Sequence, residues 1–384
     1  MPAHPILQAK VGVSPAGNEK QAAKELFDQI AQPDPAAVLF FCSPRYDRDK
    51  LGKALKAQFP GLLLGCTTAG EISPAGYHKE TLTGVSLGTG SPGNGLKIHS
   101  RMIHPLSEFC EDRAQRLADS IKGDLVLSPD FDAKRMFGLM MIDGMSMLEE
   151  SVAALLHEKL HGVSIIGGSA GDDLRFQNTY VYVDGRFLSG AALFVLVETA
   201  LPFHVFMTQH FRPTERKMVV TDAIPDRRRV VEIDGDPAAR AYADALGLDM
   251  AQLGPPMFSK YPFMLKIGGK YYVRSIQKMN ADQSLTFYCA IDNGLVLTIG
   301  EGIDLVQNLQ QQLLEIEHFV PSPRVILGCD CILRRLEAEE KGLSDKMQQV
   351  LRDHNFVGFS TYGEQYNGIH VNQTLTGVAI GGGE

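Results

Sequence analysis

Short, continuous runs of apolar residues alternate along the chain with longer stretches in which apolar residues recur every three or four positions. Ala37–Cys42 (AVLFFC) and Phe137–Ile142 (FGLMMI) are runs typical of strands that are buried on both faces. Glu19–Ala31 and Arg48–Phe59 have the helical period, and Asp47 is a candidate N-cap for the second of them. The pattern predicts strands and helices in alternation.

A strand–helix–strand unit occurs three times. Its predicted strand pairs are Ala37–Cys42 with Leu62–Leu64, Phe137–Ile142 with Val163–Ile166, and Val325–Leu327 with Phe356–Val357. The middle helix is expected to begin with a capping box of Ser146 and Glu149. Because a helical connection favours parallel strands and a right-handed crossover, we predict an α/β fold of repeated strand–helix–strand units that form mixed sheets flanked by helices.

A glycine- and hydroxyl-rich loop follows the second strand of each unit. Residues 65–88 align without a gap on residues 358–381, and ten of the 24 positions are identical, including the run TLTGV. A weaker copy, IGGSAGD, ends at Asp172 and needs one deletion. We therefore interpret the loop as an internal repeat that ends in an acid, and we expect an alternating strand after each copy.

The composition changes between the second and third units. Residues 201–320 contain many short, β-rich runs, a Gly268-Gly269 hairpin signal, and helices over Ala238–Leu246 and Leu305–Ile316. We predict an N-terminal domain over residues 1–200 and a C-terminal domain over residues 201–384. The second domain would hold an α+β insertion and the final repeat, residues 321–384.

The repeated loops are the best candidates for ligand contact. A glycine-rich loop at the end of a buried strand exposes backbone N–H groups, and the hydroxyls and acids add polar side chains. The pattern is neither that of a Walker loop nor G-x-G-x-x-G, so it indicates no nucleotide. The predicted ligand-binding residues are Gly65, Thr68, Glu71, Gly168, Asp172, Glu364 and Asn372.

Histidines and two short motifs offer other chemistry. His370 lies within the third loop beside an acid and an amide, and His78 lies one register position away in the first copy; His204 and His210 flank an apolar strand. His157–His161 reads HEKLH, the zincin pattern, but no third ligand follows at the usual distance. GGSAG fits G-x-S-x-G around Ser169, but a β-like stretch follows where a nucleophile elbow needs a helix.

Composition and charge exclude several classes of function. The 384 residues are 44% hydrophobic and 21% charged, with a net charge of −8, which argues against nucleic-acid binding. Arg227–Arg229 is the only basic run, and we expect it to form a solvated turn between two strands. The sequence contains no recognisable signal peptide or membrane-spanning run, and its six scattered cysteines suit a reducing cytoplasm; Cys329–Cys331 is C-x-C, a poor zinc motif.

The motifs GCTTAGEI, GGSAGDDL, CAIDNG and GFSTYGEQ resemble those of FIST proteins over about residues 35–381. FSTYGEQYNGIHVNQT, YYVRSIQKMN and GCDCILRRLE look like the branch described as haem-binding nitric-oxide sensors. The resemblance implies a sensory protein with non-covalent haem b, which would work beside a separate histidine kinase and influence cyclic-di-GMP signalling and biofilm behaviour. No C-x-x-C-H is present, so a side chain would supply the axial ligand.

We therefore predict a cytoplasmic sensor rather than an enzyme. On this hypothesis His370, or else His204 or His210, holds the haem iron, and nitric oxide is the ligand. The alternatives are a haem-free small-metabolite sensor, for example for amino acids, that uses the loop amides with Glu71 and Glu364, and a zinc metallohydrolase built on HEKLH. The sequence leaves the oligomeric state open, a homo-oligomer included.

Overall fold

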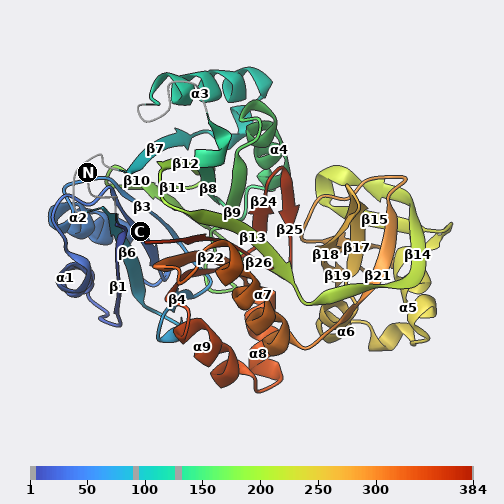
Figure 1. Cartoon of the computed structure of the whole chain (residues 1–384). Helices are drawn as coiled ribbons and strands as arrows, with labels where there is room; N and C mark the ends of the chain where they lie inside the picture. Colours follow the sequence, from blue (N-terminus) through green and yellow to red (C-terminus); the bar gives the residue numbers. More distant parts are fainter. Residues whose placement is uncertain (1–5, 90–94, 126–131, 383–384) are drawn as a thin grey trace.

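The structure, a computed structural model, describes residues 6–89, 95–125 and 132–382. Three α/β units form the body of the molecule, and a β-rich segment projects from it (Figure 1). The first unit contains β1 (Gln8–Ser14), α1 (Glu19–Ile30), β2 (Ala37–Cys42), α2 (Arg48–Gln58), β3 (Leu63–Thr67), β4 (Glu71–Ser73), β5 (Gly76–His78) and β6 (Leu82–Gly88).

The other two units repeat this order of elements. The second contains β7 (Leu96–Ile103), α3 (Glu111–Gly123), β8 (Met136–Ile142), α4 (Glu149–Lys159), β9 (Ser164–Ser169), β10 (Val181–Val183), β11 (Arg186–Leu188) and β12 (Ala192–Thr199). The third contains β13 (Phe203–Gln209), α7 (Leu305–Phe319), β22 (Val325–Cys331), α8 (Ile332–Glu340), α9 (Ser344–Arg352), β23 (Phe356–Thr361), β24 (Glu364–Tyr366), β25 (Ile369–Val371) and β26 (Thr374–Ile380).

The predicted parallel pairs are confirmed. β2 pairs with β3, β8 with β9, and β22 with β23, each in parallel, and the final strand of each unit adds antiparallel on the other side. The three final strands do not alternate as predicted. β6, β12 and β26 are buried along their whole length because one face of each packs in the central apolar cluster and the other face in a cluster beneath the helices of a unit.

Each unit gives its hairpin to another unit. β4–β5 of the first unit extends the sheet of the third beside β23, β10–β11 of the second extends the sheet of the first beside β3, and β24–β25 of the third extends the sheet of the second beside β9. The exchange closes a ring of three six-stranded sheets. One large apolar cluster draws side chains from all three sheets, so no unit completes its core alone.

Helix starts follow local capping chemistry in part. Asp47 caps α2 as predicted, through a hydrogen bond from the Lys50 amide to its side chain. The predicted capping box at Ser146 is wrong. α4 begins at Glu149 with Leu148 at the N-cap and no side-chain cap, because the Ser146 hydroxyl accepts a hydrogen bond from the Leu148 amide instead.

The β-rich segment, which we call the insertion (residues 211–302), lies between β13 and α7 and projects at the right of Figure 1. Its elements are β14 (Phe211–Ile224), β15 (Arg229–Ile233), β16 (Asp236–Pro237), α5 (Ala238–Leu246), α6 (Pro255–Lys260), β17 (Phe263–Ile267), β18 (Lys270–Arg274), β19 (Ile276–Met279), β20 (Leu285–Phe287) and β21 (Val296–Gly302). Its main apolar cluster contains insertion residues alone. The predicted Gly268-Gly269 hairpin joins β17 to β18, and both glycines have positive φ.

Candidate functional site

The three repeated loops meet at one end of the body, where the parallel strands end. Backbone hydrogen bonds connect the loops in a cycle, and three of them show how each loop contacts both others. They run from Ala69 N to Ser360 O (3.0 Å), from Gly171 N to Thr67 O (3.0 Å), and from Tyr362 N to Ser169 O (3.1 Å). This end of an α/β sheet is where ligands commonly bind, so we call it the loop face.

Glu71 is fully buried, and its carboxylate makes hydrogen bonds within its own unit. One carboxylate oxygen accepts the Thr68 hydroxyl (2.5 Å), and the other accepts the hydroxyl (2.7 Å) and amide (3.1 Å) of Thr81. Burial raises the pKa of Glu71 to about 7, although these hydrogen bonds lower it. Glu71 and Thr68 thus hold the first hairpin to the strand that follows it.

Glu364 repeats this arrangement in the third unit. It accepts the Thr361 hydroxyl on one oxygen, and the hydroxyl (2.6 Å) and amide (3.3 Å) of Thr374 on the other. Burial raises its pKa to about 8. Both acids are saturated by their own hairpins, so the amino-acid alternative that relied on Glu71 and Glu364 loses its ligand groups.

The predicted glycines serve close packing. A Cβ on Gly65 would lie 2.4 Å from the Phe40 carbonyl oxygen of the neighbouring strand. A Cβ on Gly168 would lie 2.5 Å from a Thr361 methyl group. Glycine is required at both positions because the backbones and side chains approach closely there.

Asp172 is not the counterpart of Glu71 and Glu364, contrary to the predicted repeat. In the sheet register Val181 takes their position, because residues 172–179 are an addition to the second loop. Asp172 accepts the Tyr362 hydroxyl and the amides of Phe176, Gln177 and Asn178, so it folds this segment upon itself. Burial would raise the pKa of Asp172, but these hydrogen bonds outweigh it and lower the pKa.

His370 and Asn372 lie where the sequence placed them, behind the third loop. His370 is 1% exposed, and burial lowers its pKa to about 4. Its Nδ1 lies 3.1 Å from the Gln365 amide nitrogen, which donates, so the proton of the neutral ring is on Nε2. Nε2 has no hydrogen-bond partner, and neither has any side-chain polar atom of Asn372, which is also 1% exposed. In the first unit Tyr77 takes the position of His370, which places His78 one register position away as predicted.

His204 and His210 lie in other surroundings. His204 is partly exposed and stacks on Phe319 with ring centroids 4.1 Å apart. His210 is fully buried, with Nε2 2.8 Å from a Glu337 oxygen and Nδ1 3.1 Å from Arg334 Nη1. Both of its nitrogens are occupied, so His210 has no atom free to hold an iron.

The two enzyme motifs do not assemble catalytic sites. α4 ends at Lys159, before His161, while Glu158 pairs with Lys159 on the surface. Within residues 6–89, 95–125 and 132–382, no group of three or more His, Cys, Asp or Glu side chains could hold a metal ion. Ser169 is fully buried at the end of β9, where its hydroxyl accepts a hydrogen bond from the Gln365 amide, and none of the described contacts joins it to a histidine that could take its proton.

A cleft of about 210 Å³ opens on the loop face between the body and the insertion, and we call it the interdomain cleft. The body contributes the turn before α4, residues 172–179 and Tyr362; the insertion contributes the β14–β15 turn and β20. Four aromatic residues line it: Phe176, Phe287, Tyr288 and Tyr362. Phe176 stacks on Tyr362 with centroids 4.6 Å apart, and Tyr288 lies 6.5 Å from Phe176.

Exposed apolar side chains and left-handed backbone mark the rim of this cleft. Met145 is 38% exposed, Met147 48% and Phe176 38%. Met147 and Phe176 have positive φ without being glycine, as do Asp173 and Leu174 in the same added segment. Strain of this kind costs on the order of 1–3 kcal/mol per residue and clusters at functional sites.

A buried set of charges joins the body to the insertion beside the cleft, and we call it the clamp. Arg228 donates to Glu149 (2.5 Å), to Glu150 (3.1 Å) and to the Tyr288 carbonyl (2.6 Å). Arg274 lies 3.5 Å from Glu150. Burial raises the pKa of Glu149 to about 7 even though Arg228 lowers it.

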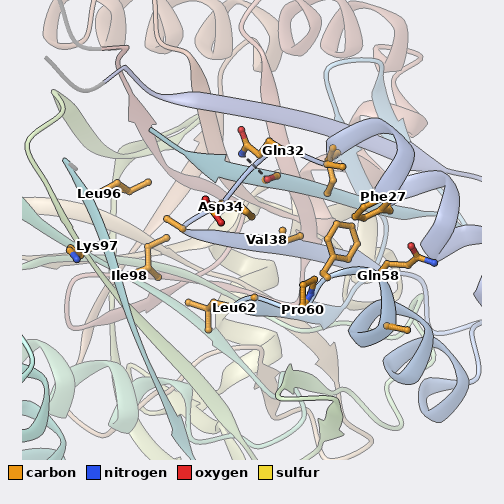
Figure 2. A pocket seen from close by; sticks show the side chains of 18 residues that line it. Phe27, Gln32, Asp34, Val38, Gln58, Pro60, Leu62, Leu96, Lys97 and Ile98 are labelled. Atoms are coloured by element: carbon orange, nitrogen blue, oxygen red, sulfur yellow. Dashed lines mark hydrogen bonds between the residues drawn. The ribbon is translucent and has the colours of Figure 1, made fainter. Parts of the chain in front are cut away.

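A second, larger cavity lies at the opposite ends of β2 and β3, away from the loop face (Figure 2). Its volume is about 960 Å³, and Phe27, Val38, Leu62 and Leu96 are among its apolar lining residues. Among the residues that the structure describes, no histidine, cysteine, methionine or tyrosine lines it. Size alone therefore does not make it a haem site, because it offers no side chain suited to the iron.

The residues present do not fit a haem in this conformation. Three histidines were predicted to hold the iron. Of these, His370 has a buried ring nitrogen, Nε2, without a hydrogen-bond partner, and it lies close to a cleft. That nitrogen lies against Gly363 in the interior, and the adjoining cleft of about 210 Å³ is smaller than the roughly 300–1,000 Å³ of a drug-sized ligand pocket.

Sequence reasoning missed the residues of the cleft and the clamp. Arg227–Arg229 does form the turn between β14 and β15, but Arg228 is only 8% exposed, because its guanidinium reaches the body. Its two acids stand in α4, far away in the sequence. Phe176 lies two residues after the GGSAGDDL motif and Tyr288 directly before CAIDNG, and no pattern in the sequence pointed to either of them.

Two known proteins are similar to this chain, one in sequence and one in structure. The chain is 24% identical to the uncharacterized protein MJ1623 of Methanocaldococcus jannaschii over 387 aligned residues, which cover 89% of this chain and 73% of the relative. The crystal structure of cyanuric acid hydrolase from A. caulinodans covers 98% of this chain and 99% of its own, at 10% identity and a TM-score of 0.35. At that score it carries no argument about fold or activity.

No helix in the described parts of the chain is long and apolar enough to cross a membrane. The model of the FIST N domain matches residues 36–236, and the model of the FIST C domain matches residues 238–367. FIST domains are associated with sensing in signal transduction. With these matches over most of its length, the chain belongs to the FIST family.

Proposed function

We propose that this protein is a sensor that binds a small molecule in the interdomain cleft and signals by a change in how the insertion sits on the body. One observation carries the proposal. An aromatic-lined cleft lies between two separately packed cores, and a buried clamp of charges joins them beside it.

Because the clamp joins the body to the insertion by polar contacts, two orientations of the insertion relative to the body are physically reasonable. Interfaces between domains that rest on polar contacts allow relative motion more readily than large apolar ones. A ligand between Phe176 and Tyr288 contacts the body and the insertion at once, so it stabilises the orientation in which both rings reach it. A separate signalling protein then reads that difference, since a ligand shifts a conformational equilibrium only by its difference in affinity.

Ligand screening by thermal shift tests the proposal. A cognate ligand raises the melting temperature of the full chain by mass action. Phe176→Ala should abolish the shift, while Gln177→Ala, an exposed neighbour in the same segment, should preserve it. Hydrogen exchange should slow at the β14–β15 turn when the ligand binds. A ligand whose shift is equal in both variants would place its site elsewhere and refute the cleft.

Haem binding with nitric-oxide sensing beside a histidine kinase is the second candidate. The unpartnered, buried Nε2 of His370 favours it. For Nε2 to bind iron, its proton would have to leave that nitrogen. The interdomain cleft would also have to widen to admit the haem. Protein reconstituted with haem should show a Soret band that His370→Ala removes and His210→Ala retains. Equal spectra for both variants would remove His370 from the hypothesis.

A further inference from the structure

We propose that the interdomain cleft recognises a small, planar, uncharged molecule with adjoining N–H and C=O groups, a cyclic amide or ureide, whose polar edge reaches His370, Asn372 and Gln365 behind Tyr362. The inference rests on the proposed function, since it names the ligand class of the same site.

The polar atoms behind Tyr362 lack partners. Nε2 of His370, both amide atoms of Asn372 and Oε1 of Gln365 make no hydrogen bond, although the three side chains are at most 1% exposed. Buried polar atoms are nearly always satisfied, so a bound group is expected to reach these. His370 and the Asn372 nitrogen donate, while the two amide oxygens accept. A partner must therefore both donate and accept.

These atoms begin directly behind the wall of the cleft. A Cβ on Gly363 would lie 2.6 Å from His370 Nε2 and 3.1 Å from Asn372 Nδ2. Gly363 follows Tyr362, which lines the cleft. The Tyr362 side chain stacks on Phe176, donates its hydroxyl to Asp172 and packs with Ala69 and Ile332. A ligand in the cleft reaches the polar atoms only when this side chain rotates out of those contacts.

The aromatic rings favour a planar molecule of limited size. Phe176 and Tyr288 lie with centroids 6.5 Å apart and ring planes tilted by 31°. A flat ring between two carbon contacts of about 3.5 Å needs roughly 7 Å, so a planar ligand requires a small adjustment of the two rings. The cleft volume of about 210 Å³ admits a ligand below the size of a typical drug.

The buried charges beside the cleft are paired with one another, while Arg227, which also lines the cleft, is exposed to solvent. The buried part of the site therefore favours a neutral ligand. Two carboxylates, Glu149 and Glu150, face two guanidinium groups, Arg228 and Arg274, so the clamp is balanced. An anion would meet the carboxylates and a cation the guanidinium groups, without a free counter-charge among these four. Neutral donors and acceptors meet neither penalty.

Calorimetric titration with uracil, a cyclic ureide, tests the inference on the full chain. 1,3-Dimethyluracil keeps the ring but blocks both N–H groups, and benzoate replaces the neutral edge with a carboxylate. We expect uracil to bind, and dimethyluracil and benzoate to bind at least tenfold more weakly. Asn372→Asp, which keeps the shape but removes the donor, should weaken uracil at least tenfold. Phe176→Ala should weaken it too, and Gln177→Ala should not.

The outcomes separate this inference from the proposed function. Benzoate that binds more tightly than uracil, with loss in Phe176→Ala, overturns the ligand class and leaves the cleft as the sensor site. Equal affinity for uracil and dimethyluracil shows that the buried polar atoms hold only water, and it overturns the inference even if Asn372→Asp fails to fold. Uracil binding that is unchanged in Phe176→Ala overturns both the inference and the proposed function.

Discussion

Replacing Glu364 with glutamine is expected to change how the stability of the protein depends on pH. The carboxyl is fully buried, and burial raises its pKa from 4.5 to about 8. Asp330 raises it further by repulsion, while hydrogen bonds from Thr361 and Thr374 lower it. The folded protein therefore favours the protonated, neutral carboxyl at pH 7.

The sign and the magnitude follow from linkage. A group whose folded pKa exceeds its unfolded pKa contributes stability that is fully present below pH 4.5 and is lost as the pH rises through 8. At about 1.4 kcal/mol per pKa unit, the rise at Glu364 corresponds to roughly 5 kcal/mol between these limits. The rise at Glu71, from 4.5 to about 7, corresponds to roughly 3 kcal/mol.

Glutamine can replace the protonated acid without losing its contacts. Its oxygen accepts the amide and hydroxyl of Thr374, and its nitrogen donates to the Thr361 hydroxyl. Melting temperature and denaturant midpoint, measured from pH 5 to pH 9, should fall with pH in the wild type. Glu364→Gln should match the wild type at pH 5 and exceed it at pH 9.

Three variants make the measurement specific. Glu71→Gln should give the same change at smaller size, and Glu340→Gln, at an exposed position on α8, should follow the wild type throughout. Glu364→Ala should lose stability at every pH, since it leaves buried hydroxyls without partners, at about 1–3 kcal/mol each. A wild type and a Glu364→Gln variant with parallel pH profiles would show that the carboxyl is already ionised in the fold.

Three further changes test other contacts. Burial opposes ionisation of Glu337, but its contacts with His210 and Lys341 lower its pKa to about 2, so Glu337→Gln should lower stability at pH 7 by thermal or denaturant unfolding, the opposite sign to Glu364→Gln. Arg228→Met should cost about 3–5 kcal/mol and speed limited proteolysis of the insertion, because it leaves the buried carboxylate of Glu149 without its partner, whereas the exposed Arg227→Met should not. Gly363→Ala should melt lower than Gly185→Ala, because both have positive φ but a Cβ meets His370 only at Gly363.

The sequence was sufficient for the elements that depend on local pattern. Ala37–Cys42 and Phe137–Ile142 are strands within one residue of their predicted bounds, because an unbroken apolar run requires burial on both faces. The repeat between residues 65–88 and 358–381 is also a structural repeat, down to the hydroxyl contacts of Glu71 and Glu364.

The exchange of hairpins lay beyond the sequence pattern. Glu71–Ser73 reads as a short strand whichever strand it joins, and its pairing with the third unit is decided by tertiary packing. The role of Arg228 was hidden for the same reason. A basic run in a turn favours solvent on composition alone, and only the fold brings Glu149 to it. The alignment that matched Asp172 with Glu71 was wrong. It needed a deletion, and the position of a deletion is ambiguous when the acid is the main residue used to fix the alignment.

The position of the cleft follows from where the threefold repeat is broken. If the three units were equal, each loop would carry the buried acid and each hairpin would lie in the same surroundings. Besides a second helix between β22 and β23, two larger departures occur among the described residues: the second loop carries the added residues 172–179 in place of a buried acid, and the third unit carries the insertion between β13 and α7. Neither addition is needed to close the ring of sheets, yet both converge on the interdomain cleft, where Phe176 of one faces Tyr288 of the other. The threefold repeat does not require these two additions, yet they meet at one site and residues 172–179 contain strained backbone. A bound ligand best explains this combination. The buried acids of the first and third loops then belong to the scaffold, and recognition belongs to the parts that differ.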